Sequence, residues 1–150
     1  MALQIAVIGS GADAEAAAEE VGRLLAERGA TVVTGGLGEV MAAASRGAKT
    51  AGGHTVGIVP GTERDTANEW VDVAIATGIG HARNLAVVAS ADAAIAVGGS
   101  WGTLAEIAYA RTLGRPVVIL DPGWKLEGDG VAHASSPAEA VETALASVID

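Results

Sequence analysis

The sequence predicts a three-layer α/β sandwich, in which a twisted, mostly parallel sheet of about six strands carries helices on both faces. Short apolar runs of strand length alternate with longer stretches of helical periodicity, which is the pattern of βαβ units. Half of the residues are hydrophobic but only 3% are aromatic, so the core must be built from Ala, Val, Ile and Leu. The length of 150 residues suits one domain spanning residues 1–150.

The predicted strands are continuous apolar runs, as expected for parallel strands that are buried on both faces. In chain order they are Leu3–Ile8, Thr31–Val33, Thr55–Val59, Val71–Ala76, Ala93–Val97 and Val117–Leu120. The stretches 60–70 and 121–136 show neither pattern, and we expect both to be loops of the same domain. Together these elements predict a Rossmann-like arrangement.

The predicted helices carry one apolar face each. The first lies between the first two strands, with Ala14, Ala18, Val21 and Leu25 on one side and Gly29 ending it. The others are expected at Val40–Ala51, Arg83–Ser90, Thr103–Leu113 and, after Pro137 in a first-turn position, Ala138–Val148.

Glycines follow the ends of the predicted strands, where the ligand crevice of such a sheet lies. The first turn, Gly9-Ser10-Gly11-Ala12-Asp13-Ala14, fits the G-x-G-x-x-G/A dinucleotide pattern. A dinucleotide site also needs an acidic residue after the second strand, where the sequence reads Thr34-Gly35-Gly36. We therefore favour a tight turn in which Gly9, Ser10 and Gly11 contact phosphate or adenine. Gly35 and Gly36, which follow the second strand, are expected to bind the same ligand.

The turn after the fifth strand is the stronger candidate for a phosphate site. Gly98-Gly99-Ser100-Trp101-Gly102-Thr103 leads into a helix and exposes backbone N–H groups at the positive end of the helix dipole. It lacks the lysine of a Walker A loop, which argues against ATP hydrolysis by that route. The alternative is a glycine-rich crossover that binds no ligand.

Glu106 has two competing interpretations. Thr103-Leu104-Ala105-Glu106 fits the S/T-x-x-E capping box, in which Thr103 caps the helix and Glu106 reaches back to it. Alternatively, Glu106 lies one turn below the phosphate site and acts as a general acid or base or contacts a ribose.

Two arginines fall in segments that leave this edge of the sheet, Arg83 and Arg64. Arg83 opens a helix, where the dipole disfavours a cation unless it faces an anion, so we expect Arg83 to contact the ligand. Trp101 is placed to stack on a base or pterin. His81 is either a base or, more commonly for a lone histidine before a helix, a surface or capping residue.

Composition excludes several classes of function. The chain has no cysteine, and its three histidines lack metal-ligand spacing, so we expect no metal site. Eighteen acidic against nine basic residues give a net charge of −9, which argues against nucleic acid as a partner. No segment reaches the roughly 20 apolar residues of a membrane helix, and residues 1–10 do not read as a signal peptide. We expect a cytoplasmic protein.

Several segments carry a family resemblance. Gly35-Gly36-Leu37-Gly38-Glu39-Val40-Met41 resembles the G-G-x-x-G-[LV]-M segment of the Lonely Guy (LOG) superfamily, and 47–53 with 56–60 resembles its G-A-x-x-A-G-G…V-x-G-I-x-P. Asn68, Thr77-Gly78 and Ala82-Arg83-Asn84 are similar to a short branch that includes molybdenum-cofactor carrier proteins. The likeness runs from about residue 5 to residue 120.

The resemblance implies a function. LOG enzymes cleave the N-glycosidic bond of nucleoside 5′-monophosphates, and their P-G-G-x-G-T-x-x-E motif holds phosphate and supplies a glutamate. By resemblance Gly99, Gly102 and Thr103 hold phosphate, Glu106 is the catalytic acid and Arg83 the catalytic arginine. The motif's proline and second glycine are Gly98 and Ser100 here.

An alternative function stays open. The short branch implies a non-catalytic carrier of molybdenum cofactor, a pterin phosphate, and a ligand-sensing module is a third class. No cofactor is required for the hydrolytic function, and the expected occupant is a nucleoside monophosphate or a molybdopterin-type ligand. The family also implies a homodimer or homotetramer.

Overall fold

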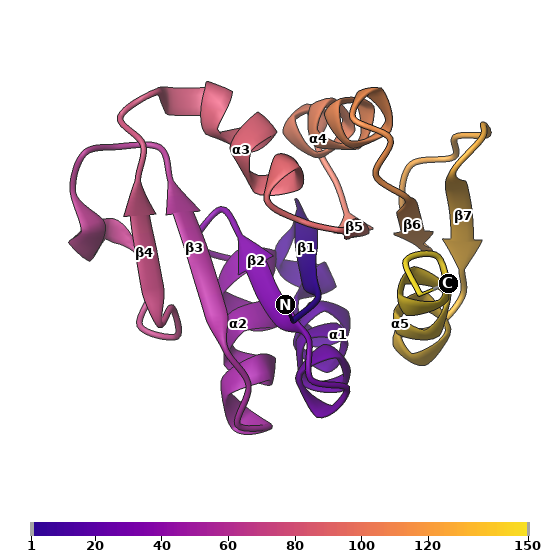
Figure 1. The fold of residues 1–150 in the computed structure, drawn as a ribbon, viewed down its shortest axis with the longest axis horizontal. Coiled ribbons are helices and arrows are strands. Elements are labelled where there is room, and N and C mark those ends of the chain that lie inside the picture. Colours follow the sequence, from indigo (N-terminus) through magenta and orange to yellow (C-terminus); the bar gives the residue numbers. More distant parts are fainter. Residues whose placement is uncertain (1, 150) are drawn as a thin grey trace.

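A computed structural model of the chain describes residues 2–149. Strands and α-helices alternate along most of the chain, as predicted (Figure 1). Three short 3₁₀ turns lie at 12–14, 64–66 and 80–82. The main elements are β1 (Gln4–Ser10), α1 (Glu15–Glu27), β2 (Thr31–Thr34), α2 (Val40–Thr50), β3 (Thr55–Val59), β4 (Val73–Ala76), α3 (Arg83–Ala89), β5 (Ala93–Gly98), α4 (Trp101–Thr112), β6 (Val117–Leu120), β7 (Val131–Ala134) and α5 (Pro137–Ala146).

The strands form one seven-stranded sheet in the order β4-β3-β2-β1-β5-β6-β7, and every pair is parallel. The chain builds outward from β1 to β4, returns to the centre at β5 and builds outward again on the other side. The strand order therefore reverses between β1 and β5, where Ser10 pairs with Gly98. Ligands of such sheets bind at the carboxyl ends of the strands beside this point.

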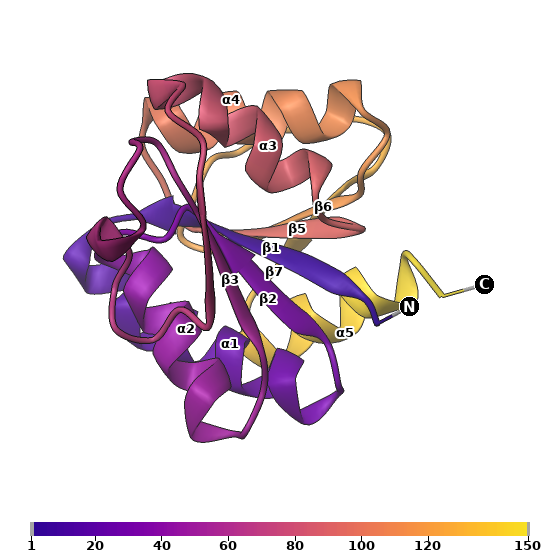
Figure 2. The same ribbon diagram turned by 60° about the vertical axis from the view of Figure 1, so that its left-hand side comes forward.

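Helices cover both faces of the sheet, which confirms the predicted three layers. α3 and α4 lie on one face, and α1, α2 and α5 lie on the other (Figure 2). Each face has its own apolar core, with Ile5, Val7 and Leu25 on the α1 side and Ile8, Val87 and Ile107 on the α3 side. Small aliphatic side chains dominate both cores, as the composition indicates.

The strand count is higher than predicted because β7 lies inside the stretch 121–136 that we expected to be a loop. Its four residues, Val-Ala-His-Ala, form an edge strand that pairs only with β6, and three of them are incompletely buried. A short edge strand lacks the continuous apolar run of a buried strand, so the sequence pattern did not indicate it.

The burial expected for the fourth strand is also wrong. β4 begins at Val73 and forms the other edge of the sheet, where Val73 and Ile75 are 55% and 46% exposed. Its apolar side chains therefore face outward in the monomer.

α1 and α2 pack backbone against backbone through two glycines. A Cβ on Gly47 would lie 1.9 Å from the carbonyl oxygen of Glu19, and one on Gly22 would lie 2.0 Å from that of Ala44. Helix axes this close leave no room for a side chain at either position.

Gly47→Ala is expected to lower the free energy of unfolding by about 1–3 kcal/mol, because overpacking outweighs the better helix propensity of alanine. Urea denaturation would measure the change. Gly128→Ala is the control, since nothing lies within 4 Å of a Cβ there. Equal midpoints for the two variants would contradict the close packing.

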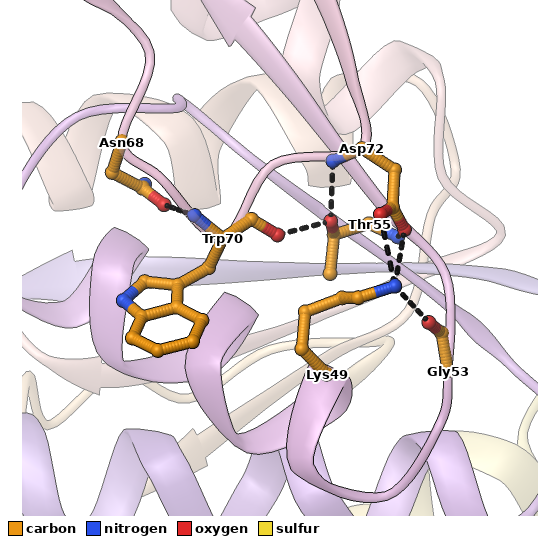
Figure 3. A network of polar contacts seen from close by, with 6 residues as sticks. All are labelled: Lys49, Gly53, Thr55, Asn68, Trp70 and Asp72. Atoms are coloured by element: carbon orange, nitrogen blue, oxygen red, sulfur yellow. Dashed lines mark hydrogen bonds and ion pairs between the residues drawn. The ribbon is translucent and has the colours of Figure 1, made fainter.

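A polar network ties the end of α2 to the start of β3 and to the segment before β4 (Figure 3). Lys49 Nζ lies 2.9 Å from Asp72 Oδ1 and donates to the Gly53 carbonyl. Asp72 Oδ2 accepts the Thr55 N–H at 2.9 Å, and the Thr55 hydroxyl donates to the Trp70 carbonyl. The network lies at the amino end of β3, so Lys49 has a structural role.

Asp72→Asn is expected to lower the free energy of unfolding by about 1 kcal/mol at neutral pH, because the ion pair of Asp72 with Lys49 is partly exposed and solvent weakens it. Burial raises the pKa of the Asp72 carboxyl, but hydrogen bonds from Lys49 and Thr55 outweigh it and hold the pKa below its ordinary value. The stabilisation is therefore complete above pH 4 or so and disappears as the pH falls through the lowered pKa. Urea titrations should show a smaller difference in the free energy of unfolding between the wild type and Asp72→Asn at pH 3 than at pH 7. A larger difference at pH 3 would contradict this role.

Candidate functional site

A cavity of about 170 Å³ opens at the carboxyl ends of β1 and β2, beneath the starts of α3 and α4. Four segments far apart in the sequence line it, and they include most of the predicted site residues. The lining comprises Val7, Ile8, Gly9, Ser10, Gly35, Met41, His81, Arg83, Asn84, Ser100, Gly102, Thr103 and Glu106. We call it the Arg83–Glu106 cavity.

The Gly98–Thr103 turn forms one wall of the cavity. A Cβ on Gly98 would lie 2.5 Å from the Ser10 carbonyl oxygen, so only glycine lets the turn pass this close to β1. α4 begins at Trp101, which leaves the first N–H groups of the helix without intrahelical partners. These donors at the positive helix end suit a phosphate.

The predicted capping box is wrong. The N-cap of α4 is Ser100 rather than Thr103, and the Ser100 N–H donates to Thr103 Oγ1 at 3.3 Å. Thr103 is the third helical residue and is 2% exposed. Glu106 takes no part in this cap, because the helix begins two residues earlier than the sequence pattern indicates.

The Glu106 carboxyl is therefore not engaged in the helix cap, and it lines the cavity. Burial raises the pKa of its carboxyl to about 7, although the Arg83 charge opposes this shift. A carboxyl with this pKa is protonated in half of the molecules near neutral pH, as a general acid requires.

Arg83 is a buried cation that forms no ion pair with any carboxylate among residues 2–149. Arg83 is 9% exposed, its Nε has no hydrogen-bond partner among the described residues, and its Nη1 lies 3.9 Å from Met41 Sδ. Burial lowers the pKa of the guanidinium, against the opposing charge of Glu106. Burying an unpaired charge is costly, so an anion that entered the cavity beside Arg83 would relieve this cost.

Gly35 makes room for this guanidinium. A Cβ at Gly35 would lie 1.6 Å from Arg83 Nη1. The turn that carries Gly35 is held by Asn68, whose side-chain amide donates to the carbonyls of Gly36 and Leu37 at 3.2 and 2.8 Å. The sequence resemblance at 35–41 thus corresponds to a platform beneath Arg83.

A second, wider groove of about 580 Å³ lies on the other side of the Gly98–Gly99 backbone. Gly11, Gly98 and Gly99 line it, and Ser10 lines both spaces. Trp124 and Lys125 also line it, and Trp124 Nε1 donates to the Ser100 carbonyl at 3.1 Å. We call it the Trp124 groove.

Two predicted binding residues line neither space. The Gly36 N–H donates to Thr34 Oγ1 at 3.0 Å, and Gly36 itself packs against Val59. Trp101 is 77% exposed and lies at the rim, with its ring 5.3 Å from that of Trp124. Arg64 also lies outside both linings.

Several lining residues were missing from the predicted site, among them three that carry polar or aromatic groups or contact Arg83. Asn84 and Met41 line the Arg83–Glu106 cavity, and Trp124 lines the groove. Asn84 follows Arg83 directly, and its amide nitrogen would lie 3.9 Å from a Cβ on Gly102. Its position next to Arg83 in the sequence could have identified Asn84 as a site residue. Trp124 lies in a loop, where no hydrophobic periodicity indicates the position of a side chain.

Within residues 2–149, no three His, Asp or Glu side chains are grouped as a metal ion would need. No helix in the same range is long and apolar enough to span a membrane.

Comparison with known proteins places the chain in a family. The profile of the SLOG cluster4 family matches residues 2–147. An uncharacterized protein of Archaeoglobus fulgidus is 44% identical over 98% of this chain and 97% of its own length. Cytokinin riboside 5′-monophosphate phosphoribohydrolase of Mycobacterium tuberculosis is 36% identical over 74% of this chain, and a probable enzyme of that name from rice is 36% identical over 75%. The matched regions span 64% and 50% of those two proteins.

Solved structures agree with this placement. The molybdenum cofactor binding protein of Rippkaea orientalis has a TM-score of 0.92 and 35% identity, with 99% of each chain covered. The molybdenum cofactor carrier protein of Chlamydomonas reinhardtii has a TM-score of 0.86 and 31% identity, covering 99% of this chain and 98% of its own. The resemblance inferred from the sequence motifs is confirmed, and the chain belongs to the SLOG cluster4 family.

Proposed function

We propose that the protein hydrolyses the N-glycosidic bond of a nucleoside 5′-monophosphate with an adenine-type base. The observation that carries this proposal is the pairing of Glu106, whose carboxyl has a pKa of about 7, with the unpartnered cation Arg83 in one cavity. The relatives named phosphoribohydrolases support it.

The phosphate of the substrate would rest on the N–H groups of the Gly98–Thr103 turn. Arg83 would pair with the substrate from the opposite wall, as a donor of fixed geometry. The ribose would then lie over Glu106. A cavity of about 170 Å³ suits a sugar phosphate, with the base directed toward the opening.

In the reaction, a water oxygen would bond to C1′ while the bond from C1′ to the base nitrogen breaks and its electron pair stays with the base. Protonated Glu106 would give its proton to the departing base and recover one from the attacking water. The products are the free base and ribose 5-phosphate. Positive charge that develops on the sugar is the feature that this reaction shares with glycoside hydrolysis.

Purified protein incubated with AMP tests the proposal. Free adenine and ribose 5-phosphate should appear in equal amounts, and a panel of purine and pyrimidine monophosphates would define the base. Release of no base from any member of the panel would refute the hydrolytic function.

A second function, carriage of molybdenum cofactor, has one specific observation in its favour. The likeness to the Rippkaea orientalis protein covers 99% of both chains, whereas the matches to the two enzymes span 64% and 50% of their lengths. The Trp124 groove offers an indole face and Lys125 to a pterin phosphate. Tight pterin binding without nucleotide cleavage would favour the carrier.

We further propose that a second copy of the chain covers the outer surface of α3 and α4, giving a homodimer or homotetramer. Leu85, Tyr109 and Leu113 are 39–41% exposed there, beside Trp101. Sedimentation velocity at micromolar concentration would find the oligomer, and a monomer alone would contradict it.

A further inference from the structure

Glu39 adopts a backbone conformation that side chains normally avoid. Its φ of 54° is the only positive φ among the described non-glycine residues, and its ψ is −124°. These angles match the first central position of a type II′ turn, which favours glycine. The LOG segment G-G-x-x-G-[LV]-M has glycine at this very position. Strain of this kind persists only where the surroundings impose it and often marks function.

The side chain of Glu39 reaches across to the turn after β1. Its Oε2 accepts the Gly11 N–H at 2.9 Å. That N–H belongs to the Gly9-Ser10-Gly11 turn, which fits the dinucleotide pattern and faces the Trp124 groove. A carboxylate therefore already occupies the donor that a second phosphate would use there.

The other charges around this turn have mixed sign. The Asp13 carboxylate would lie 3.0 Å from a Cβ on Gly11, so a second negative charge lies close to this turn. Among residues 2–149, Lys125 is the one cation that lines the Trp124 groove. The turn itself therefore faces two carboxylates, and an anion approaching Gly11 would meet repulsion.

We propose that Glu39 is a specificity-determining residue that closes the Gly9–Gly11 turn to phosphate. The site then accepts ligands with one phosphate, bound at the Gly98–Thr103 turn, and discriminates against nucleoside diphosphates and dinucleotides. The inference rests on the proposed function only for the position of the first phosphate.

Calorimetric titration with AMP and ADP tests this role, in a Glu106→Gln background that keeps AMP intact. Without a change at Glu39, ADP should bind about tenfold more weakly than AMP. Glu39→Gly removes the carboxylate and places glycine in a conformation that suits it, so the variant should fold. It should gain about tenfold in ADP affinity, while AMP affinity changes less than twofold.

Two further variants separate charge from shape. Glu39→Gln keeps an acceptor near Gly11 without the charge and should gain about threefold for ADP. Glu63→Gln removes the same charge from an exposed loop outside both spaces and should gain nothing. An ADP affinity that is the same with and without the Glu39 carboxylate would overturn the proposal, as would an equal gain from Glu63→Gln.

A measurement that needs no nucleotide keeps the two proposals distinguishable. In NMR spectra, the Gly11 amide of the wild type should stay in place on addition of inorganic phosphate and should shift in Glu39→Gly. Equal shifts in both proteins would overturn the role of Glu39, whatever the nucleotides do. Failure of AMP to bind any variant, with the amide behaving as expected, would instead refute the proposed function alone.

Discussion

Replacing Glu106 by glutamine is expected to lower kcat for AMP cleavage by at least about 100-fold, because general acid catalysis contributes about 10²–10⁴. Glutamine keeps the shape of the side chain but cannot give a proton to the departing base. Glu106 forms no part of the helix cap, so the loss would not reflect unfolding. Steady-state assay of adenine release measures the change.

Stability provides the control for this variant. The Glu106 carboxyl has a pKa of about 7 in the folded protein, above the ordinary value of 4.5. The wild type therefore loses stability as the pH rises from 4.5 through 7, because the folded state resists ionisation. Glu106→Gln avoids this loss and should be more stable than the wild type at pH 8. An active Glu106→Gln protein would exclude catalysis by Glu106.

Arg83→Met is expected to lower kcat/KM for AMP by about 100-fold, because a buried charge-assisted contact to the ligand is lost. Methionine fills part of the same space without a charge. The variant has a second, independent consequence. Arg83 opposes the rise in the Glu106 pKa, so its removal should raise that pKa further above 7.

The pH profile of kcat/KM detects this shift. With Glu106 as the acid, the wild-type rate should fall as the pH rises through about 7, and the fall should move to higher pH in Arg83→Met. Arg83→Lys keeps the charge but not the bidentate geometry, so its kcat/KM should still fall as the pH rises through about 7. If the fall in kcat/KM occurs at the same pH in Arg83→Met as in the wild type, the coupling of Arg83 and Glu106 is contradicted.

Most of the fold could be predicted because its strands are buried on both faces. The runs that became β1, β5 and β6 are almost entirely apolar; the predicted range of β6 is the observed one, and those of β1 and β5 differ from the observed ranges by at most two residues at either end. The exceptions are the two edges. β7 has too short an apolar run to be recognised, and β4 has an apolar run that is not buried in the monomer. The hydrophobic pattern of a segment shows which of its side chains are apolar. Whether the segment lies at the edge of the sheet depends on which strands pair, and the pattern does not contain that information.

Site residues could be predicted where they lie just after the carboxyl end of a predicted strand. The turns at Gly9, Gly35 and Gly98 and the residues Arg83 and Glu106 are brought together because parallel strands place their carboxyl ends at one edge. The helix start was misplaced because Ser100 and Thr103 are both good capping residues, and only the backbone decides between them. The bond from Gly11 to Glu39 joins residues 28 apart in sequence and has no local signal.

A crystal structure of the Glu106→Gln protein with AMP tests the central claim most directly. The phosphate should lie on the N–H groups of the Gly98–Thr103 turn, with Arg83 in contact with the nucleotide and C1′ next to the side chain of residue 106. AMP bound only in the Trp124 groove, with Arg83 and residue 106 untouched, would contradict it.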